Sequence, residues 1–128
     1  MKRILLDTHT LLWWLADSPL LGAQARSLIA DTRNPIYVSA TTTWEIAIKR
    51  AEGMLEAPDD MDRIVEDEGF EKLPITLFHG EQAGSLPEIH RDPFDRMLIA
   101  QAQAEGLELL TKDSEIPAYN IKVIDAGM

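Results

Sequence analysis

Short apolar runs alternate with amphipathic stretches along the chain, and this pattern predicts both its elements and its fold class. Strands are expected at the short apolar runs 4–6, 36–38, 73–77, 107–110 and 121–124. Helices are expected where apolar residues recur at intervals of three and four, at 11–16, 23–30, 41–55 and 94–104. Met61, Ile64 and Val65 form a narrower apolar stripe on one side of a charged segment. Strands that alternate with helices favour an α/β domain with a mostly parallel sheet.

The length fits one compact domain, which we expect to span residues 1–128. The chain has 128 residues, of which 45% are hydrophobic, and it contains no repeat, linker or low-complexity tract. No apolar run approaches the roughly 20 residues of a membrane helix. Asp7 interrupts the first apolar run too early for a signal-peptide core. The absence of cysteine excludes disulfides, thiolate metal sites and cysteine nucleophiles. These features predict a cytoplasmic protein with no membrane association.

The net charge of −10 is unusual for a protein that handles nucleic acid, but it is unevenly distributed. The acidic segment, residues 56–71, carries eight acids and one base and so accounts for −7 of the total. Its charges are most simply the solvated face of a helix. The rest of the chain carries −3, and setting aside four candidate metal ligands leaves +1. The acidity therefore does not exclude RNA, although it predicts weak binding without metal and a local basic contact surface.

Four isolated acids stand out because of their positions beside the expected strands. Asp7 directly follows the first strand, and Asp113 follows the strand at 107–110. Glu45 lies early in the helix after the second strand, and Asp95 lies in the first turn of the helix that leads into 107–110. In open parallel sheets, ligands bind beyond the carboxyl ends of the strands. The four acids can therefore reach one edge of the sheet.

Carboxylates that converge in a cleft repel one another, and a hard divalent cation relieves that repulsion. Oxygen ligands suit Mg²⁺ or Mn²⁺. Metals held by carboxylates are common in phosphodiester hydrolysis, where they activate water and stabilise the leaving oxygen. The pattern thus favours a metal-dependent hydrolase.

Each acid also has a structural interpretation. Glu45 is placed to pair with Lys49 one helical turn later. Asp92, Pro93 and Asp95 form a good helix start, with Asp92 as N-cap. Asp113 can be an ordinary turn residue. Asp7 is harder to explain structurally, because an acid at the end of a buried strand needs a partner, a turn role or a metal.

Four segments of the chain resemble the PIN domain family and, within it, the VapC-type toxins of type II toxin–antitoxin systems. They are ILLDTHTLLWWL, SATTTWEIAIK, HRDPFDRMLIAQA and LLTKD, in this order and over essentially the whole chain. The third is the most specific. The resemblance implies a sheet of order 3-2-1-4-5 flanked by helices, and a Mg²⁺- or Mn²⁺-dependent endoribonuclease. It also implies a cognate antitoxin protein as partner and a homodimer.

The resemblance also implies roles for individual residues. Asp7, Asp95, Glu45 and Asp113 would be the catalytic, metal-binding acids, with Asp7 and Asp95 the surest ligands. The supporting residues would be Thr8, Thr111 and Asp92, the two threonines by orienting an acid or a water. For Asp92 we favour the N-cap over the ligand role.

Other side chains near these motifs are candidates for weaker roles. Phosphate contacts are expected from one or two of the neighbouring cations Lys49, Arg50, Arg91, Arg96 and Lys112. Turn or capping roles are expected for the scattered histidines His9, His79 and His90. Core packing or a dimer surface is expected for the tryptophans Trp13, Trp14 and Trp44, ahead of base stacking.

Two other function classes remain open on the sequence. The chain could be a catalytically silent PIN domain whose role is to bind an antitoxin, and metal-stimulated cleavage would distinguish this from the enzyme. A phosphatase or receiver-type protein also places Asp after the first strand. However, Asp7-Thr8-His9 lacks the second Asp of haloacid-dehalogenase-like phosphatases, and strand one does not end in the acidic pair of receivers. No glycine-rich phosphate loop supports nucleotide binding.

Overall fold

The computed structural model describes residues 1–113, 116 and 119–128. Within this part of the chain, strands and helices alternate as the sequence predicts. The strands are β1 (Ile4–Leu6), β2 (Ile36–Ser39), β3 (Glu71–Leu73), β4 (Glu108–Thr111) and β5 (Val123–Asp125). The helices are α1 (Thr8–Leu15), α2 (Ala23–Ala30), α3 (Ala40–Ala51), α4 (Met61–Asp67), α5 (Leu77–Ser85) and α6 (Pro93–Glu105).

The strands form one sheet in the order β3-β2-β1-β4-β5, and every neighbouring pair is parallel. This confirms the expected order 3-2-1-4-5. The central strand β1 is fully buried, with Leu5 paired to Tyr37 on one side and to Leu109 on the other. Because the strands are parallel, β1 and β4 end at the same edge of the sheet.

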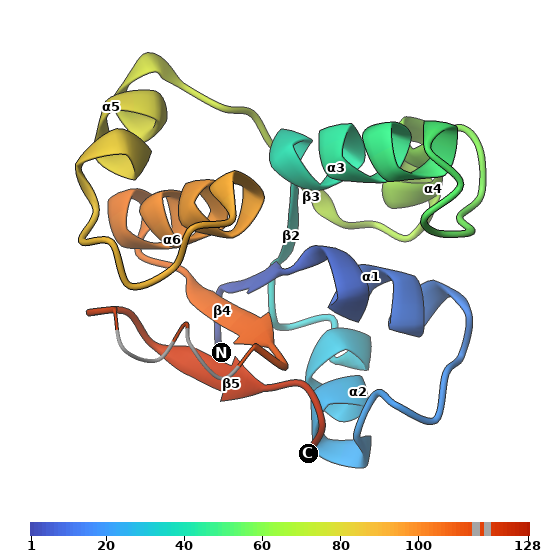
Figure 1. Ribbon diagram of the computed structural model, residues 1–128. Helices are drawn as coiled ribbons and strands as arrows, with labels where there is room; N and C mark the ends of the chain where they lie inside the picture. The colour runs from blue at the N-terminus through green and yellow to red at the C-terminus, as the bar shows by residue number, and fades with distance from the viewer. Residues whose placement is uncertain (114–115, 117–118) are drawn as a thin grey trace.

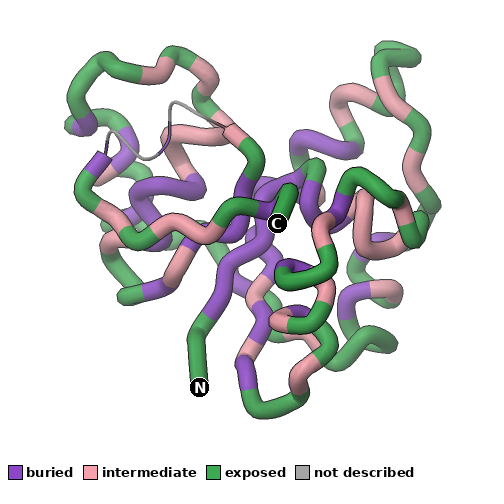
Figure 2. Tube along the Cα trace, turned by 90° about the horizontal axis from the view of Figure 1, so that it is seen from below, coloured by how far each residue is buried: buried purple, intermediate pink, exposed green. Residues whose placement is uncertain are grey.

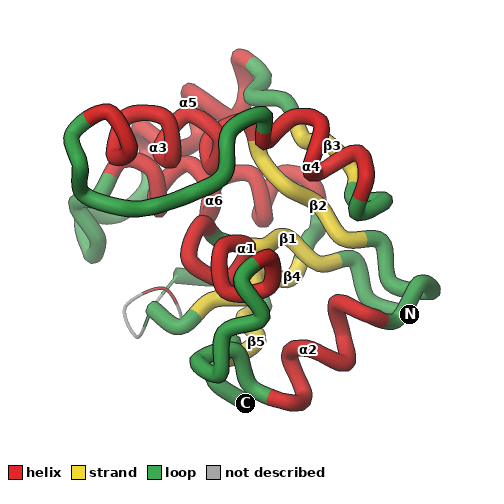
Figure 3. Tube along the Cα trace, turned by 90° about the vertical axis from the view of Figure 1, so that its right-hand side faces the viewer, coloured by secondary structure: helices red, strands yellow, loops and turns green. Residues whose placement is uncertain are grey.

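Helices cover both faces of the sheet (Figure 1). Ile4 and Leu6 point into a core shared with α1, α2, α3 and α4, whereas Leu5 points into a second core shared with α5 and α6. The buried strands run through the middle of the molecule and exposed segments surround them (Figure 2). The helix α1, which follows β1, lies beside β4 (Figure 3). The chain therefore turns sharply at Asp7, between the central strand and its helix.

Several of the expected elements have other bounds in the structure; the helix expected at 41–55, for example, ends at Ala51. The first helix begins at Thr8, not at residue 11, because the Asp7 side chain accepts a hydrogen bond from the Thr10 backbone N–H and caps the helix. The strand expected at 73–77 occupies Glu71–Leu73 and is followed by helix α5, which the periodicity did not predict. Thr76 starts α5 as the N-cap of a capping box with His79.

The acidic segment forms the loop before α4, the helix itself and the turn that leads into β3. Met61 and Val65 of α4 are buried against the sheet, as the apolar stripe predicted. Asp62 and Glu66 are exposed and pair with Lys72 of β3, the strand at one edge of the sheet. The segment is thus a solvated helix face, and its charges lie on a different element from each of the four candidate acids.

No helix in the described ranges is long and apolar enough to cross a membrane.

Candidate functional site

Asp7 lies at the carboxyl end of β1 with a side chain that is only 7% exposed. Its Oδ1 accepts the capping hydrogen bond from the Thr10 N–H at 2.9 Å, and its Oδ2 accepts a hydrogen bond from the Thr111 hydroxyl at 2.5 Å. Burial raises the pKa of Asp7 above its ordinary value, although the hydrogen bonds from Thr10 and Thr111 oppose the shift. Burial therefore disfavours the ionised form of this carboxyl group, and a nearby cation would stabilise that form.

Thr111 connects the ends of two neighbouring strands. Its hydroxyl donates to Asp7 and accepts the backbone N–H of Asp113 at 3.0 Å. Because Thr111 is the last residue of β4, the same contacts fix the start of the turn that carries Asp113. The expected supporting role of Thr111 therefore has a concrete geometry, in which it orients one acid through its side chain and a second through the backbone.

Asp95 lies in the first turn of α6, which Asp92 caps. The Asp92 side chain accepts the backbone N–H groups of Phe94 at 2.8 Å and Asp95 at 3.2 Å, and Pro93 occupies the first turn. This confirms Asp92 as the N-cap. The cap aims the Asp95 side chain towards the strand ends that carry Asp7 and Asp113.

Burial, together with neighbouring acids, raises the pKa of Asp95 to about 7. After burial, the largest contribution is the charge of Asp92, and Asp113 and Asp7 add to it, while His90 opposes the shift. Carboxylates from α6, from the end of β1 and from the end of β4 therefore lie within electrostatic reach of one another. The sequence predicted that these acids meet at one edge of the sheet, and their charges contribute to the raised pKa of Asp95 after burial and Asp92.

Glu45 is buried on α3, and both of its oxygens are hydrogen-bonded. The Thr8 hydroxyl donates to Oε1 at 2.6 Å, and the Lys49 ammonium donates to Oε2 at 2.5 Å. Glu45 raises the pKa of Lys49, and the charges of Asp92 and Asp95 contribute to the same shift. The Lys49 ammonium thus pairs with Glu45 within electrostatic reach of Asp92 and Asp95, so the expected pair is largely buried beside the acids and is not an ordinary surface contact.

His90 is a site residue that the sequence analysis did not place. Its Nε2 lies 2.7 Å from Asp113 Oδ2 and 3.1 Å from Asp95 Oδ2. These three side chains are the group among the described residues whose potential ligand atoms all lie within 4.8 Å of one another. The available signal was its position two residues before Asp92, but turn or capping roles were the expected ones.

The remaining cations differ in how far they are available to a substrate. The Arg96 guanidinium donates to four backbone carbonyl oxygens at the end of α5 and in the loop that follows it, at 2.9 to 3.2 Å. We therefore assign Arg96 a structural role in place of the expected phosphate contact. Lys112 is 59% exposed and lies 3.6 Å from Asp125, and Arg91 is exposed in the loop before α6.

The other histidines and the tryptophans are absent from the close group of His90, Asp95 and Asp113, although the charge of His9 acts on Asp7. His79 is buried and closes the capping box of α5, which confirms a capping role, whereas His9 is exposed beside Trp13. Trp13 and Trp14 pack at the border of the core. Trp44 is 58% exposed and meets the Phe94 ring edge-on, so a dimer surface stays a prediction for this residue.

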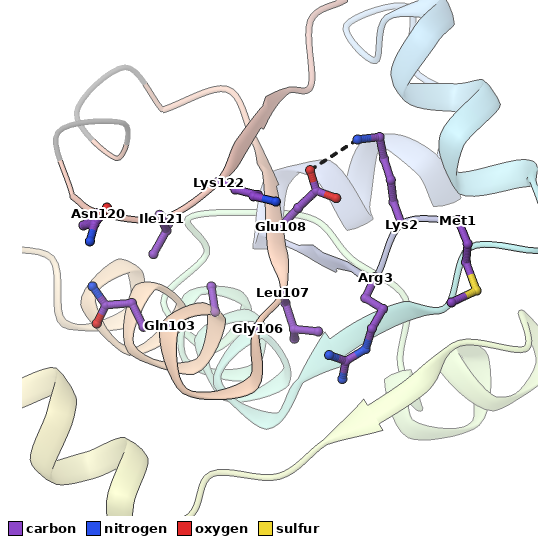
Figure 4. A pocket seen from close by; sticks show the side chains of 11 residues that line it. Met1, Lys2, Arg3, Gln103, Gly106, Leu107, Glu108, Asn120, Ile121 and Lys122 are labelled. Atoms are coloured by element: carbon purple, nitrogen blue, oxygen red, sulfur yellow. Dashed lines mark hydrogen bonds and ion pairs between the residues drawn. The ribbon is translucent and has the colours of Figure 1, made fainter.

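A separate pocket of about 620 Å³ lies at the opposite edge of the sheet (Figure 4). Lys2, Arg3 and Leu107 line it, and all three precede strands, so it faces the amino ends of β1 and β4. Lys2 pairs with Glu108 there, and Arg3 donates to the Glu105 carbonyl oxygen. The converging acids lie at the other edge of the sheet, where their carboxylates could bind a cation.

The donor set fits a hard divalent cation. Asp7, Asp95 and Asp113 offer carboxylate oxygens, and two of these acids have pKa values raised by burial or neighbouring charge. The chain contains no cysteine that would favour a soft metal. Oxygen donors in a partly buried, negatively charged site are what Mg²⁺ and Mn²⁺ bind.

Comparison with known proteins agrees with this architecture. The PIN domain family matches residues 4–122. Ribonuclease VapC22 of Mycobacterium tuberculosis is 26% identical over 122 residues, which is 93% of each chain. A chain of a toxin–antitoxin complex from Klebsiella pneumoniae superposes with a TM-score of 0.67 at 20% identity, covering 96% of this chain and 97% of that one. A chain of DNA-bound VapBC from Salmonella typhimurium gives 0.65 at 20% identity over 98% of both. The protein belongs to the PIN domain family.

Proposed function

We propose that the protein is a Mg²⁺- or Mn²⁺-dependent endoribonuclease and the toxin of a toxin–antitoxin pair. The observation that carries the proposal is the meeting of acids at one edge of the sheet, where the ligand atoms of Asp95, Asp113 and His90 lie within 4.8 Å of one another and Asp7 lies within electrostatic reach of Asp95. The similarity to a protein named a ribonuclease supports RNA as the substrate.

Asp7, Asp95 and Asp113 would hold the ion, and Glu45 would complete the site. When bound, the ion would lower the pKa of a water molecule and stabilise the negative charge that develops on the phosphodiester. The chain's own contribution is orientation. Thr111 fixes Asp7, and the Asp92 cap fixes the backbone of Asp95.

The surroundings of Glu45 limit its freedom. Thr8 and Lys49 occupy both oxygens of Glu45, so the direction of its side chain is fixed without an ion. Lys49 is consequently engaged within the site. Arg91 and Lys112 are the exposed cations of the motifs, and we propose that they contact RNA phosphates.

The names of the structural neighbours support an antitoxin protein as partner, because they describe toxin–antitoxin and VapBC complexes.

We also propose a homodimer. Apolar side chains are exposed on α3 and α5, among them Trp44 at 58%, Leu77 at 91% and Phe78 at 59%. Light scattering of the purified chain tests this, and a monomer at micromolar concentration would reject it. We further propose that the protein acts in the cytoplasm, where an RNA substrate and an antitoxin partner would be met.

End-mapping of total bacterial RNA tests the activity. The purified chain, free of antitoxin, is incubated with RNA in Mg²⁺, Mn²⁺ or EDTA, beside the Asp95→Asn and Asp7→Asn variants. We expect discrete new ends that need the metal and disappear in both variants. Asp67→Asn is the matched control, because Asp67 is 68% exposed on α4 and should leave the cleavage unchanged. Cleavage that persists in Asp95→Asn or in EDTA would reject the proposed site. A folded wild-type chain that produces no new ends would favour a silent PIN domain that binds an antitoxin.

A further inference from the structure

The His90 imidazole joins two acids that come from different parts of the fold. Its Nε2 is 2.7 Å from Asp113 Oδ2 and 3.1 Å from Asp95 Oδ2. Asp95 belongs to the first turn of α6, and Asp113 follows β4. One ring nitrogen therefore lies against both carboxylates.

The second ring nitrogen shows where the hydrogen of the neutral ring is. The backbone N–H of Asp92 points at His90 Nδ1 from 3.2 Å, and an N–H can be donated only to a nitrogen with a free lone pair. Nδ1 is therefore the acceptor, and the neutral ring carries its hydrogen on Nε2. In this orientation, Nε2 donates to the acids and is not available as a metal ligand.

The loop that carries His90 is held from outside the site. The Arg96 guanidinium donates to the carbonyl oxygens of His90 at 3.2 Å and Pro87 at 3.0 Å. The His90 backbone N–H donates to the Tyr119 hydroxyl at 2.7 Å, and that hydroxyl donates to the Pro87 carbonyl at 3.0 Å. These contacts fix the backbone on both sides of the ring, and the side chain is only 12% exposed. The ring is thus placed between the acids by the fold, and its position does not depend on an ion.

We propose that His90 is a positioning residue whose Nε2–H occupies the place of the cation between Asp95 and Asp113 until the ion binds. The inference rests on the metal dependence of the proposed function. Two carboxylates this close repel each other, and an N–H directed at both offsets the repulsion. An ion between the same oxygens gives the same compensation and repels the N–H, so the two exclude each other. His90 therefore stabilises the metal-free site and weakens the binding of the ion.

Paired variants separate this role from a structural one. His90→Phe and His90→Leu replace the ring N–H by apolar side chains of two different shapes. His90→Gln keeps an N–H at a similar distance from the backbone. Mn²⁺ binding to the full chain is measured at one fixed pH by the electron paramagnetic resonance of free Mn²⁺ and by calorimetry. Thermal unfolding is measured in EDTA and in saturating Mn²⁺.

We expect His90→Phe and His90→Leu to bind Mn²⁺ about ten-fold more tightly than wild type, which corresponds to one hydrogen bond to a charged group. Both should unfold at a lower temperature in EDTA and near the wild-type temperature in Mn²⁺, and His90→Gln should resemble wild type throughout. Weaker or unchanged Mn²⁺ binding in both apolar variants would overturn the inference while the metal site stands. A wild-type chain that binds no Mn²⁺ would overturn the metal dependence, and the inference with it.

Discussion

The pKa of Asp95 makes the stability of the metal-free protein depend on pH in a specific direction. A carboxyl group whose pKa is about 7 in the folded chain and 3.8 when unfolded binds its proton more tightly in the folded state. The contribution of Asp95 to the free energy of unfolding is fully present below about pH 4 and is lost as the pH rises towards 7. The metal-free protein should therefore become less stable between about pH 5 and about pH 8.

The size of the effect follows from the same two values. One pKa unit corresponds to about 1.4 kcal/mol, and between about pH 5 and about pH 8 the linkage relation gives a loss of about 2–3 kcal/mol from Asp95. Its side chain is 22% exposed, so solvent screens it only in part. Asp7 has a raised pKa as well and acts in the same direction. Asp31, whose pKa is lowered to about 2 by Arg33, titrates at lower pH and does not interfere.

Urea unfolding in EDTA across this pH range is the assay, with wild type, Asp95→Asn and the exposed control Asp67→Asn in parallel. We expect the pH-dependent loss to be about 2–3 kcal/mol smaller in Asp95→Asn than in the other two. Saturating Mn²⁺ should raise the stability of wild type most at the higher pH, since the ion binds the ionised acids. Equal pH dependence in wild type and Asp95→Asn would refute the assignment of the raised pKa to Asp95.

Substitutions of three further residues, Thr111, Lys49 and Arg96, test what holds the acids and their loops in place. Thr111→Val should lower the free energy of unfolding by about 1.5–3 kcal/mol, because a buried carboxylate loses a hydrogen-bond donor, and Thr111→Ser should recover most of it in the same urea titration. Lys49→Met should destabilise the metal-free protein by about 3 kcal/mol by leaving buried Glu45 without its cation; a double variant with Glu45→Gln that is no more stable than Lys49→Met alone would argue against this. Arg96→Met should expose the loop before α6 to limited proteolysis and cost about 2 kcal/mol in thermal unfolding, and an unchanged cleavage pattern would reject the structural role of Arg96.

The sequence predicted those parts of the molecule that depend on local patterns and on the direction of the chain. Parallel strands bring acids that follow them to one edge, so Asp7 and Asp113 could be placed together without coordinates. The Asp92-Pro93 pair predicted the start of α6, and the structure confirms Asp92 as its N-cap. Helix α5 was missed because Leu77 and Phe78, at its start, are exposed and give no periodic apolar face.

His90 could not be assigned from the sequence because its role arises from contacts between distant segments, and the surroundings of Arg96 and Lys49 depend on how nearby segments fold around them. His90 meets Asp113, 23 positions away along the chain, and is held by Tyr119 at a separation of 29. Arg96 carries a charge like any surface arginine, and only the fold turns its guanidinium towards four carbonyl oxygens. Lys49 was correctly spaced to pair with Glu45, but the burial of that pair depends on Thr8, which belongs to another helix.

These contacts explain how a small domain tolerates several acids at one edge of its sheet. The hydroxyls of Thr8 and Thr111 each donate to one carboxylate, the Lys49 ammonium neutralises Glu45, and the His90 N–H lies between Asp95 and Asp113. Burial first, and then the charges of Asp92, Asp113 and Asp7, nevertheless raise the pKa of Asp95 to about 7. The residual repulsion is what a divalent ion relieves when it binds, and part of the ion's binding free energy therefore appears as increased stability of the fold. In Asp95→Asn, metal affinity and the stability gained on adding metal should consequently fall together, whereas in His90→Phe and His90→Leu the metal affinity should rise while the stability without metal falls.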